Sequence, residues 1–217
     1  MEDKKIKTKV LRPQFDSDLD IIDLSNECIE DESIFSFGTV NPCSIENHEA
    51  DRVNFKQVIF KKVIFNKIIF RRIELVDVIF ENCDLSNVDF NEATLHRVEF
   101  VNCKIIGINL TEATFRDVVF DNCNGEFAFF SYSNFKQVAF LQCQLRSSDF
   151  KNSKFIKVEF QESNLLQAQM NFTALKKLDF TTCNIAGISA NITDFEGARV
   201  TTMQAVSLSA ILGLIIK

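Results

Sequence analysis

Five cysteines are separated by twenty residues or a multiple of twenty. They are Cys83, Cys103, Cys123, Cys143 and Cys183, with Ser163 at the remaining place of the series and Cys43 in the same register. Zinc binds sets of four thiolates, so the series could form a metal site. Side chains one structural repeat apart point in parallel, however, and no histidine shares the series in its main run. We therefore expect reduced, core-filling thiols, with no bound metal and no disulfides.

The two histidines are the other candidates for chemistry. His96 stands beside Arg97 at an outward position, and His48 lies in a less regular stretch, with no nucleophile or zinc motif around either. Glycine and proline number only 6 and 2, which leaves little material for the glycine-rich loops that cradle phosphates. The sequence predicts a protein that is not an enzyme and that carries no cofactor.

The element that positions these residues is a repeat of five. Counting in fives from Phe55 to Val200 gives 30 positions, of which 28 are Phe, Leu, Ile, Met or Val; the exceptions are Gly125 and Ala190. Two places before each of them stands a small or aliphatic residue. A strand buries every second residue and a helix follows a period of 3.6, so neither explains two buried residues in every five.

A period of twenty lies within the period of five. Phenylalanine occupies every twentieth position from Phe60 to Phe180, and valine precedes it by two from Val58 to Val158. Four sides of five residues would stack such positions directly above one another. We expect an all-β, four-sided solenoid of roughly seven coils, about 35 Å long at a strand spacing of ~4.8 Å.

The repeat resembles a known family. SNF at 133–135, SDF at 148–150, SNL at 163–165, CDL at 83–85 and TDF at 193–195 resemble the A(D/N)LXX unit of the pentapeptide-repeat proteins. The resemblance implies a right-handed quadrilateral β-helix. Its Qnr and MfpA-like members imply a homodimeric DNA mimic that binds DNA gyrase or topoisomerase IV and is linked to fluoroquinolone resistance. The register from Val53 to Val200 has no insertion, so the loops that help many Qnr proteins protect gyrase are missing.

The repeats also suggest three segments. Residues 1–32 would form an acidic N-terminal cap, 33–200 the solenoid, most regular over 53–200, and 201–217 a C-terminal helix and tail. Residues 13–51 hold eleven acids and no Lys or Arg. The spacing of Leu19, Ile22 and Ile29 predicts a short helix between Asp18 and Glu30 that caps the first coil, with an acidic contact arm as the alternative.

The tail departs from the register of five. Thr201 or Thr202 can cap a helix from about Met203 to Leu212 that ends at Gly213. Its apolar residues exceed what closing one end requires, and the resemblance also implies dimerisation here; the alternative is an intramolecular cap. The candidate interface residues are Met203, Val206, Leu208, Ile211 and Leu212.

Charge differs between the sides of the expected solenoid. One side carries acids without an outward base over six coils: Glu81, Glu99, Asp121, Glu159, Glu162 and Asp179. We expect this acidic face to bind a partner's Lys- and Arg-lined groove, with solubility as the alternative. The next side is rich in bases, which could instead contact nucleic acid directly: Lys56, Arg97, Arg116, Lys136, Lys154, Lys157, Lys176 and Lys177. Our main expectation is binding of a type II topoisomerase without direct nucleic-acid binding.

A second function, a scaffold module with another protein partner, stays open. It would use the acidic N-terminal segment or the exposed aromatics, which could equally pack a corner around Gly125: Phe127, Phe129, Tyr132 and Phe172. The opening MEDKK precedes no apolar stretch, and the longest apolar run is far shorter than a membrane span. We expect a cytoplasmic protein that does not bind membranes.

Overall fold

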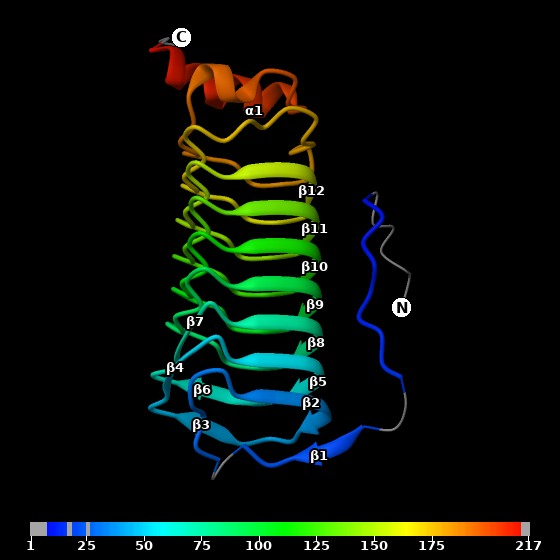
Figure 1. Ribbon diagram of the computed structural model, residues 1–217. Coiled ribbons are helices and arrows are strands. Elements are labelled where there is room, and N and C mark those ends of the chain that lie inside the picture. The colour runs from blue at the N-terminus through cyan, green and yellow to red at the C-terminus, as the bar shows by residue number, and fades with distance from the viewer. Residues whose placement is uncertain (1–7, 17–18, 25–26, 214–217) are drawn as a thin grey trace.

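The computed structural model describes residues 8–16, 19–24 and 27–213. They form a right-handed quadrilateral β-helix, a stack of coils closed at one end by a short helix (Figure 1). An eight-stranded parallel sheet follows the order β1-β2-β5-β8-β9-β10-β11-β12, and the pairs β3-β6 and β4-β7 form two smaller parallel sheets. The predicted fold class is therefore confirmed.

The strands are short because each coil turns a corner every five residues. Their bounds are β1 Asp20–Ile22, β2 Ile34–Val40, β3 Ser44–Glu46, β4 Glu49–Asp51, β5 Asn54–Lys61, β6 Ile64–Asn66, β7 Ile69–Arg71, β8 Glu74–Glu81, β9 Thr94–Val101, β10 Thr114–Asp121, β11 Asn134–Leu141 and β12 Lys154–Gln161. The helical elements are η1 Ile192–Phe195, α1 Thr202–Leu208 and η2 Ser209–Leu212. From β2 onward strand partners differ by twenty residues, as in Phe60↔Phe80 and Phe80↔Phe100, whereas β1 pairs with β2 at an offset of eighteen, as in Asp20↔Gly38.

We number the sides by their inward residues. Side 1 holds positions 55, 75, 95 and each twentieth residue onward, side 2 begins at 60, side 3 at 65 and side 4 at 70. The long strands cover sides 1 and 2, and the corner between them lies at Gln57, Asp77 and their equivalents. Corner residues adopt a left-handed backbone, which directs N–H groups to the next coil: Asn82 N–H donates to Val101 O at 2.9 Å. The inter-coil ladder is thereby continued around the corners, which offsets the cost of positive φ at residues other than glycine.

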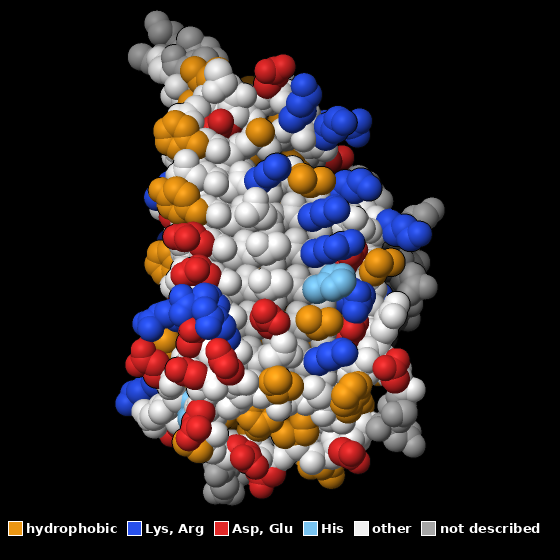
Figure 2. Space-filling view, viewed as in Figure 1, with side chains coloured by type: hydrophobic (Ala, Val, Ile, Leu, Met, Phe, Trp, Pro, Cys, Tyr) orange, Lys and Arg blue, Asp and Glu red, His pale blue; other side chains and the backbone are white. Residues whose placement is uncertain are grey.

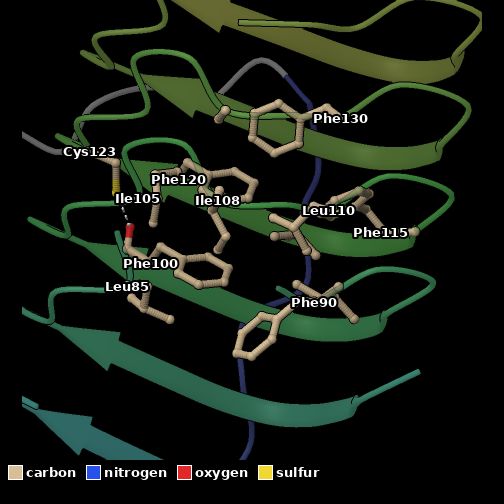
Figure 3. Packing of buried hydrophobic residues seen from close by; sticks show 14 of the residues in the cluster. Leu85, Phe90, Phe100, Ile105, Ile108, Leu110, Phe115, Phe120, Cys123 and Phe130 are labelled. Atoms are coloured by element: carbon tan, nitrogen blue, oxygen red, sulfur yellow. Dashed lines mark hydrogen bonds between the residues drawn. The ribbon is translucent and has the colours of Figure 1, made fainter. Parts of the chain in front are cut away.

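The interior consists of stacked side chains (Figure 3). On side 2, neighbouring rings from Phe60 to Phe160 lie 4.7–4.9 Å apart and within 9° of parallel. This distance equals the strand spacing, so each ring lies over the ring of the coil below. Gly125, where a large residue was expected, leaves space that Leu145 and Ile105 fill, because a Cβ there would lie 3.0–3.2 Å from their side chains.

The cysteine series has a structural role. Cys103 Sγ donates to Phe80 O and Cys123 Sγ to Phe100 O, both at 3.3 Å. Serine and threonine do the same elsewhere, as in Ser153 Oγ to Phe130 O at 2.9 Å. The small slot therefore favours residues that fill little space and can donate to the carbonyl of the coil below, which volume alone did not predict. Burial raises the pKa of the Cys183 thiol, as expected for a structural cysteine.

The helix predicted between Asp18 and Glu30 is wrong for the described residues, since Asp20–Ile22 form β1 and residues 27–30 are irregular. Position 18 and residues 25–26 lie outside the described part. The capping role itself is present: Leu24 and Ile29 are buried, and Ile22 lies so close to Gly38 that a Cβ there would overlap it. A strand satisfies the free edge of β2 directly, which a helix could not do.

The C-terminal helix was predicted correctly. Thr201 Oγ1 accepts from Gln204 N–H at 3.2 Å, and Gly213 ends η2 with a left-handed φ of 70°. Gln204 Nε2 also donates to Phe180 O and Cys183 O, each at 2.8 Å. One glutamine side chain thus caps the helix and also donates hydrogen bonds to two carbonyls of the last full coil.

Candidate protein-interaction surface

The six predicted acids lie along side 2 and its corner with side 3. Glu81, Glu99, Asp121, Glu159 and Asp179 are half-buried and Glu162 is exposed. Glu162 accepts from Gln142 Nε2 at 2.8 Å. The structure therefore brings these residues onto one side, as the twenty-residue spacing predicted, but it also adds a segment that the sequence analysis did not place there.

Residues 8–16, which we call the strap, run along the solenoid parallel to its axis (Figure 1). Thr8 N–H donates to Glu159 Oε2 at 3.3 Å, near the C-terminal coils. At the other end, Asp16 N–H donates to Gln57 Oε1 at 3.2 Å. The strap thus spans the coils of β5 to β12 and contacts the acidic side over most of its length.

Corner side chains hold the strap by its backbone. Leu11 N–H donates to Asp117 Oδ1 at 3.0 Å and Gln14 N–H to Asp77 Oδ1 at 2.9 Å. Gln137 Nε2 donates to Lys9 O at 2.9 Å. With Gln57, these residues lie in one column of corner positions spaced by twenty, which Arg97 also shares. We call the four that contact the strap the track: Gln57, Asp77, Asp117 and Gln137.

The strap also makes two side-chain contacts on side 2. Val10 packs against Val119, Ala139 and Leu141, which point outward from the solenoid yet are buried. Arg12 Nη1 lies 2.9 Å from Glu99 Oε1, whose side chain is 15% exposed. Outward apolar residues were the available sign of a covering segment, although they do not locate it by themselves.

Asp77 is held in its ionised form by the bonds that it accepts. Burial raises the pKa of Asp77, but bonds from the Arg97 guanidinium and the Gln14 N–H outweigh it and hold the pKa below its usual value. Arg97 Nη2 lies 2.5 Å from Asp77 Oδ2. Arg97, predicted to be part of the basic side, is therefore committed to an intramolecular ion pair.

The strap is held with little net free energy. A net hydrogen bond contributes about 1 kcal/mol, somewhat more with a charged acceptor, and Val10 is only partly buried. Ordering a backbone costs roughly 1–2 kcal/mol per residue, and the strap contains nine residues. The contacts are few relative to this ordering cost, so removing one or two of them should release the strap.

Side 1 is the basic side. Figure 2 shows Lys and Arg side chains in a line on the face in view, and acidic side chains gathered toward the N-terminal end. Lys56, Arg116 and Lys136 are exposed there, whereas His96 is half-buried. Burial and the charges of Arg97 and Arg116 lower the pKa of His96, which favours its neutral form.

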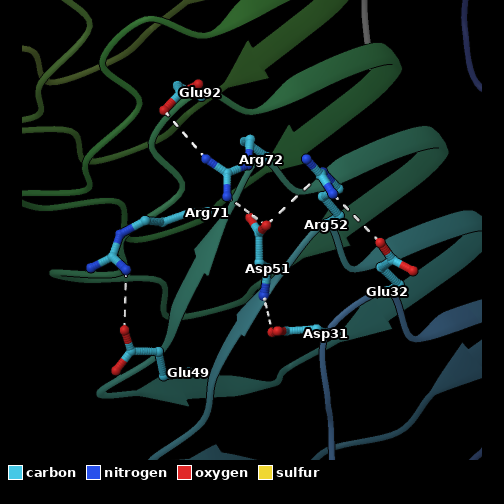
Figure 4. Close-up of polar contacts among 8 residues, drawn as sticks. All are labelled: Asp31, Glu32, Glu49, Asp51, Arg52, Arg71, Arg72 and Glu92. Atoms are coloured by element: carbon cyan, nitrogen blue, oxygen red, sulfur yellow. Dashed lines mark hydrogen bonds and ion pairs between the residues drawn. The ribbon is translucent and has the colours of Figure 1, made fainter.

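The acidic N-terminal segment is partly neutralised by the next coils (Figure 4). Asp51 Oδ2 lies 2.5 Å from Arg72 Nη2, and Glu49 Oε1 lies 3.1 Å from Arg71 Nη1. Arg52 Nη1 lies 3.5 Å from Glu32 Oε1. These pairs weaken the alternative reading of the segment as a strongly acidic arm.

Apolar side chains are exposed at several places of the described surface, including Ile21, Ile34 and Phe37 at the N-terminal end, and two of these places were predicted. The predicted outward aromatics are exposed by 47–69%: Phe127, Phe129, Tyr132 and Phe172. At the C-terminal end, Met203 is 75% and Val206 45% exposed. Leu208 and Ile211 line an adjoining apolar cleft of about 230 Å³ with η1 residues, and the Leu212 side chain lies outside the described part.

Among the described residues, no three His, Cys, Asp or Glu side chains are arranged to hold a metal ion. No helix in that part of the chain has the length and apolar content of a membrane span. The described surface carries columns of charge, a strap and apolar patches.

Comparison with known proteins identifies the family. The profile of the pentapeptide repeat region matches residues 49–105 and 93–170, which together make up more than half of the chain. The chain belongs to the pentapeptide-repeat family. Among solved structures, HetL, a pentapeptide-repeat protein involved in heterocyst differentiation regulation in the cyanobacterium Nostoc sp. strain PCC 7120, is 14% identical with a TM-score of 0.51. The alignment covers 78% of this chain and 87% of HetL, and shows the common fold.

A second pentapeptide-repeat structure is full-length QnrB1, a plasmid-mediated fluoroquinolone resistance protein. It is 19% identical, with a TM-score of 0.37, and the alignment covers 89% of this chain and 95% of QnrB1. No curated protein matches the chain.

Proposed function

We propose that this pentapeptide-repeat protein is a non-catalytic, homodimeric binding rod whose partner is a type II topoisomerase. The observation that carries the proposal is the gathering of six carboxylates on one side of a rigid solenoid. Acids at coil-by-coil intervals can substitute for phosphates in a groove lined by Lys and Arg. Two of the six, Glu99 and Glu159, also bond to the strap.

The dimer is proposed to form at the C-terminal end. Helix α1 buries none of its residues within the chain, and it presents Met203 and Val206 beside the apolar cleft. A twofold contact through Met203, Val206, Leu208, Ile211 and Leu212 would cover this surface and double the length of the rod.

A DNA gyrase supercoiling assay with titrated protein, with and without a fluoroquinolone, tests the proposal. We expect inhibition or drug rescue that falls at least tenfold in potency when Glu81, Asp121 and Glu162 are changed together to lysine. The matched control changes Glu112 and Glu126, which lie on other sides, to lysine and should retain activity. No effect of the unaltered protein at concentrations well above that of gyrase would contradict the partner assignment.

The exposed aromatics support a second candidate, a scaffold for a different protein. Phe127, Tyr132 and Phe172 lie at corners and Phe129 on side 4, and all four rings are exposed, up to 69% at Phe172. Exposed aromatic rings of this kind are common at protein-interaction sites. This function predicts that changing Phe129 and Phe172 to serine abolishes capture of the partner without altering gyrase activity. Retained capture by that variant would remove the aromatic scaffold from consideration.

A further inference from the structure

The track matches an extended polypeptide in its dimensions. Leu11 and Gln14 are three residues apart in the strap and bond to Asp117 and Asp77, which are two coils apart. Three extended residues span about 10 Å, and two coils span about 9.6 Å. An extended chain can therefore bond to Asp77 and Asp117 without bending, while Arg97 stands at the coil between them and pairs with Asp77. These two bonds are donated by backbone N–H groups, whereas Asp16 also accepts from Gln57 Nε2 through its side chain.

Selectivity comes from the neighbouring positions of side 2. Val119, Ala139 and Leu141 form an apolar seat for Val10, and Glu99 pairs with Arg12. The preferred occupant is therefore an extended segment with an aliphatic residue two positions before a basic one.

Release of the strap would leave the polar groups of the track satisfied but its apolar seat exposed. Asp77 would keep Arg97, and Asp117 would keep the bond from Gln137 Nε2 at 2.9 Å. Val119, Ala139 and Leu141 would instead face water. The strap forms no β-ladder with the solenoid, since residues 8–16 contain no strand and the bonds found run to and from side chains. The vacated track thus favours a replacement peptide over bare solvent.

We propose that the track is a binding site for an extended segment of a partner protein with this aliphatic-x-basic pattern, and that the strap is the occupant which the partner displaces. The peptide binds because the distance between its N–H groups matches the distance between corner side chains of the solenoid. The proposal requires no topoisomerase and stands apart from the function proposed above.

A labelled synthetic peptide with the strap sequence TKVLRPQFD is the probe. It is titrated by fluorescence anisotropy into the full chain and into the full-chain double variant Val10→Asp, Arg12→Glu, whose own strap is weakened. We expect saturable binding at least tenfold tighter to the variant, because the tethered strap of the unaltered chain competes at millimolar effective concentration. A peptide carrying the same two changes is the matched control and should not bind.

Two further measurements separate the outcomes. Amide exchange at Leu11, Gln14 and Asp16 should accelerate in the double variant, and adding Ala139→Asp to it should abolish peptide binding while circular dichroism stays unchanged. A strap that exchanges no faster, or a released strap with no gain in peptide binding, overturns the proposal. A solution mass of the double variant above that of the unaltered chain at the same concentration, without peptide binding, would assign the track to a second copy of the chain and also overturn it.

Discussion

The two ends of the solenoid close in opposite ways. At the N-terminal end, Leu24 and Ile29 are buried and Ile22 packs onto Gly38, so apolar residues point inward. At the C-terminal end, Gln204 makes polar bonds to the last full coil, and Met203 and Val206 face outward. Both ends leave apolar side chains exposed, with Ile21 and Ile34 at the N-terminal end 75% and 74% exposed. The difference lies in the capping elements: the N-terminal cap buries Leu24 and Ile29 in the core, whereas helix α1 has no buried residue.

The largest change in the free energy of unfolding is expected from a substitution at the N-terminal end. Ile29→Ala should lower the free energy of unfolding by about 2–5 kcal/mol, because it removes a buried side chain and leaves a cavity. Met203→Ala at the other end should change it by less than about 0.5 kcal/mol, since that side chain is exposed. Chemical denaturation followed by circular dichroism measures both. Equal losses would show that the ends do not differ in this way.

The second effect concerns association. Val206→Glu combined with Ile211→Glu should convert the proposed dimer to a monomer and leave the denaturation midpoint nearly unchanged. Analytical ultracentrifugation gives the mass, and Thr202→Glu, on an exposed position of the same helix, is the matched control. An unchanged mass in the double variant would eliminate the helix as the dimer interface.

The smallest expected effect is a change of stability with pH at the N-terminal end. The bond to Arg72 lowers the pKa of Asp51 below its usual value near 3.9, so the contribution of Asp51 to stability is present above about pH 4. It is lost as the pH falls through the lowered pKa. The first turn of α1 contains no acid, so capping of the C-terminal helix should not respond in this way.

The variant Asp51→Asn isolates this contribution. It should be less stable than the unaltered chain at pH 6, and the difference should narrow as the pH is lowered below about 4, as measured by denaturation at each pH. Glu112→Gln, which changes an exposed acid on another corner, should show no such convergence. A difference that stays the same as the pH is lowered would contradict the assignment.

Much of the fold could be predicted because burial repeats at short range. Phe60, Phe80 and Phe100 stack in the structure as the period of twenty indicated, and the capped C-terminal helix was evident at Thr201 and Gly213. The cap at Ile22 was misjudged, because three apolar residues at near-helical spacing also suit a strand that pairs with an open sheet edge. Only the position of β2 favours one over the other.

The candidate surface was predicted in part. Its six acids lie on one side as the spacing indicated, but the contacts of Arg12 with Glu99 and of Val10 with Ala139 were not predicted. Val119, Ala139 and Leu141 are outward apolar residues buried beneath the strap, whereas Ile64 and Ile156, also outward, are exposed. Outward apolar residues alone therefore do not locate the covering segment.

The sequence by itself determined the coil, its four sides and the direction in which each side chain points. Every inward residue contacts neighbours five or twenty positions away, so a simple periodicity specifies the packing. Only the tertiary structure decided that residues 8–16 lie along side 2 and bond to its carboxylates Glu99 and Glu159. The contacts of the strap join residues from 41 to 151 positions apart, and an irregular segment without periodicity carries no sequence signal for where it will lie.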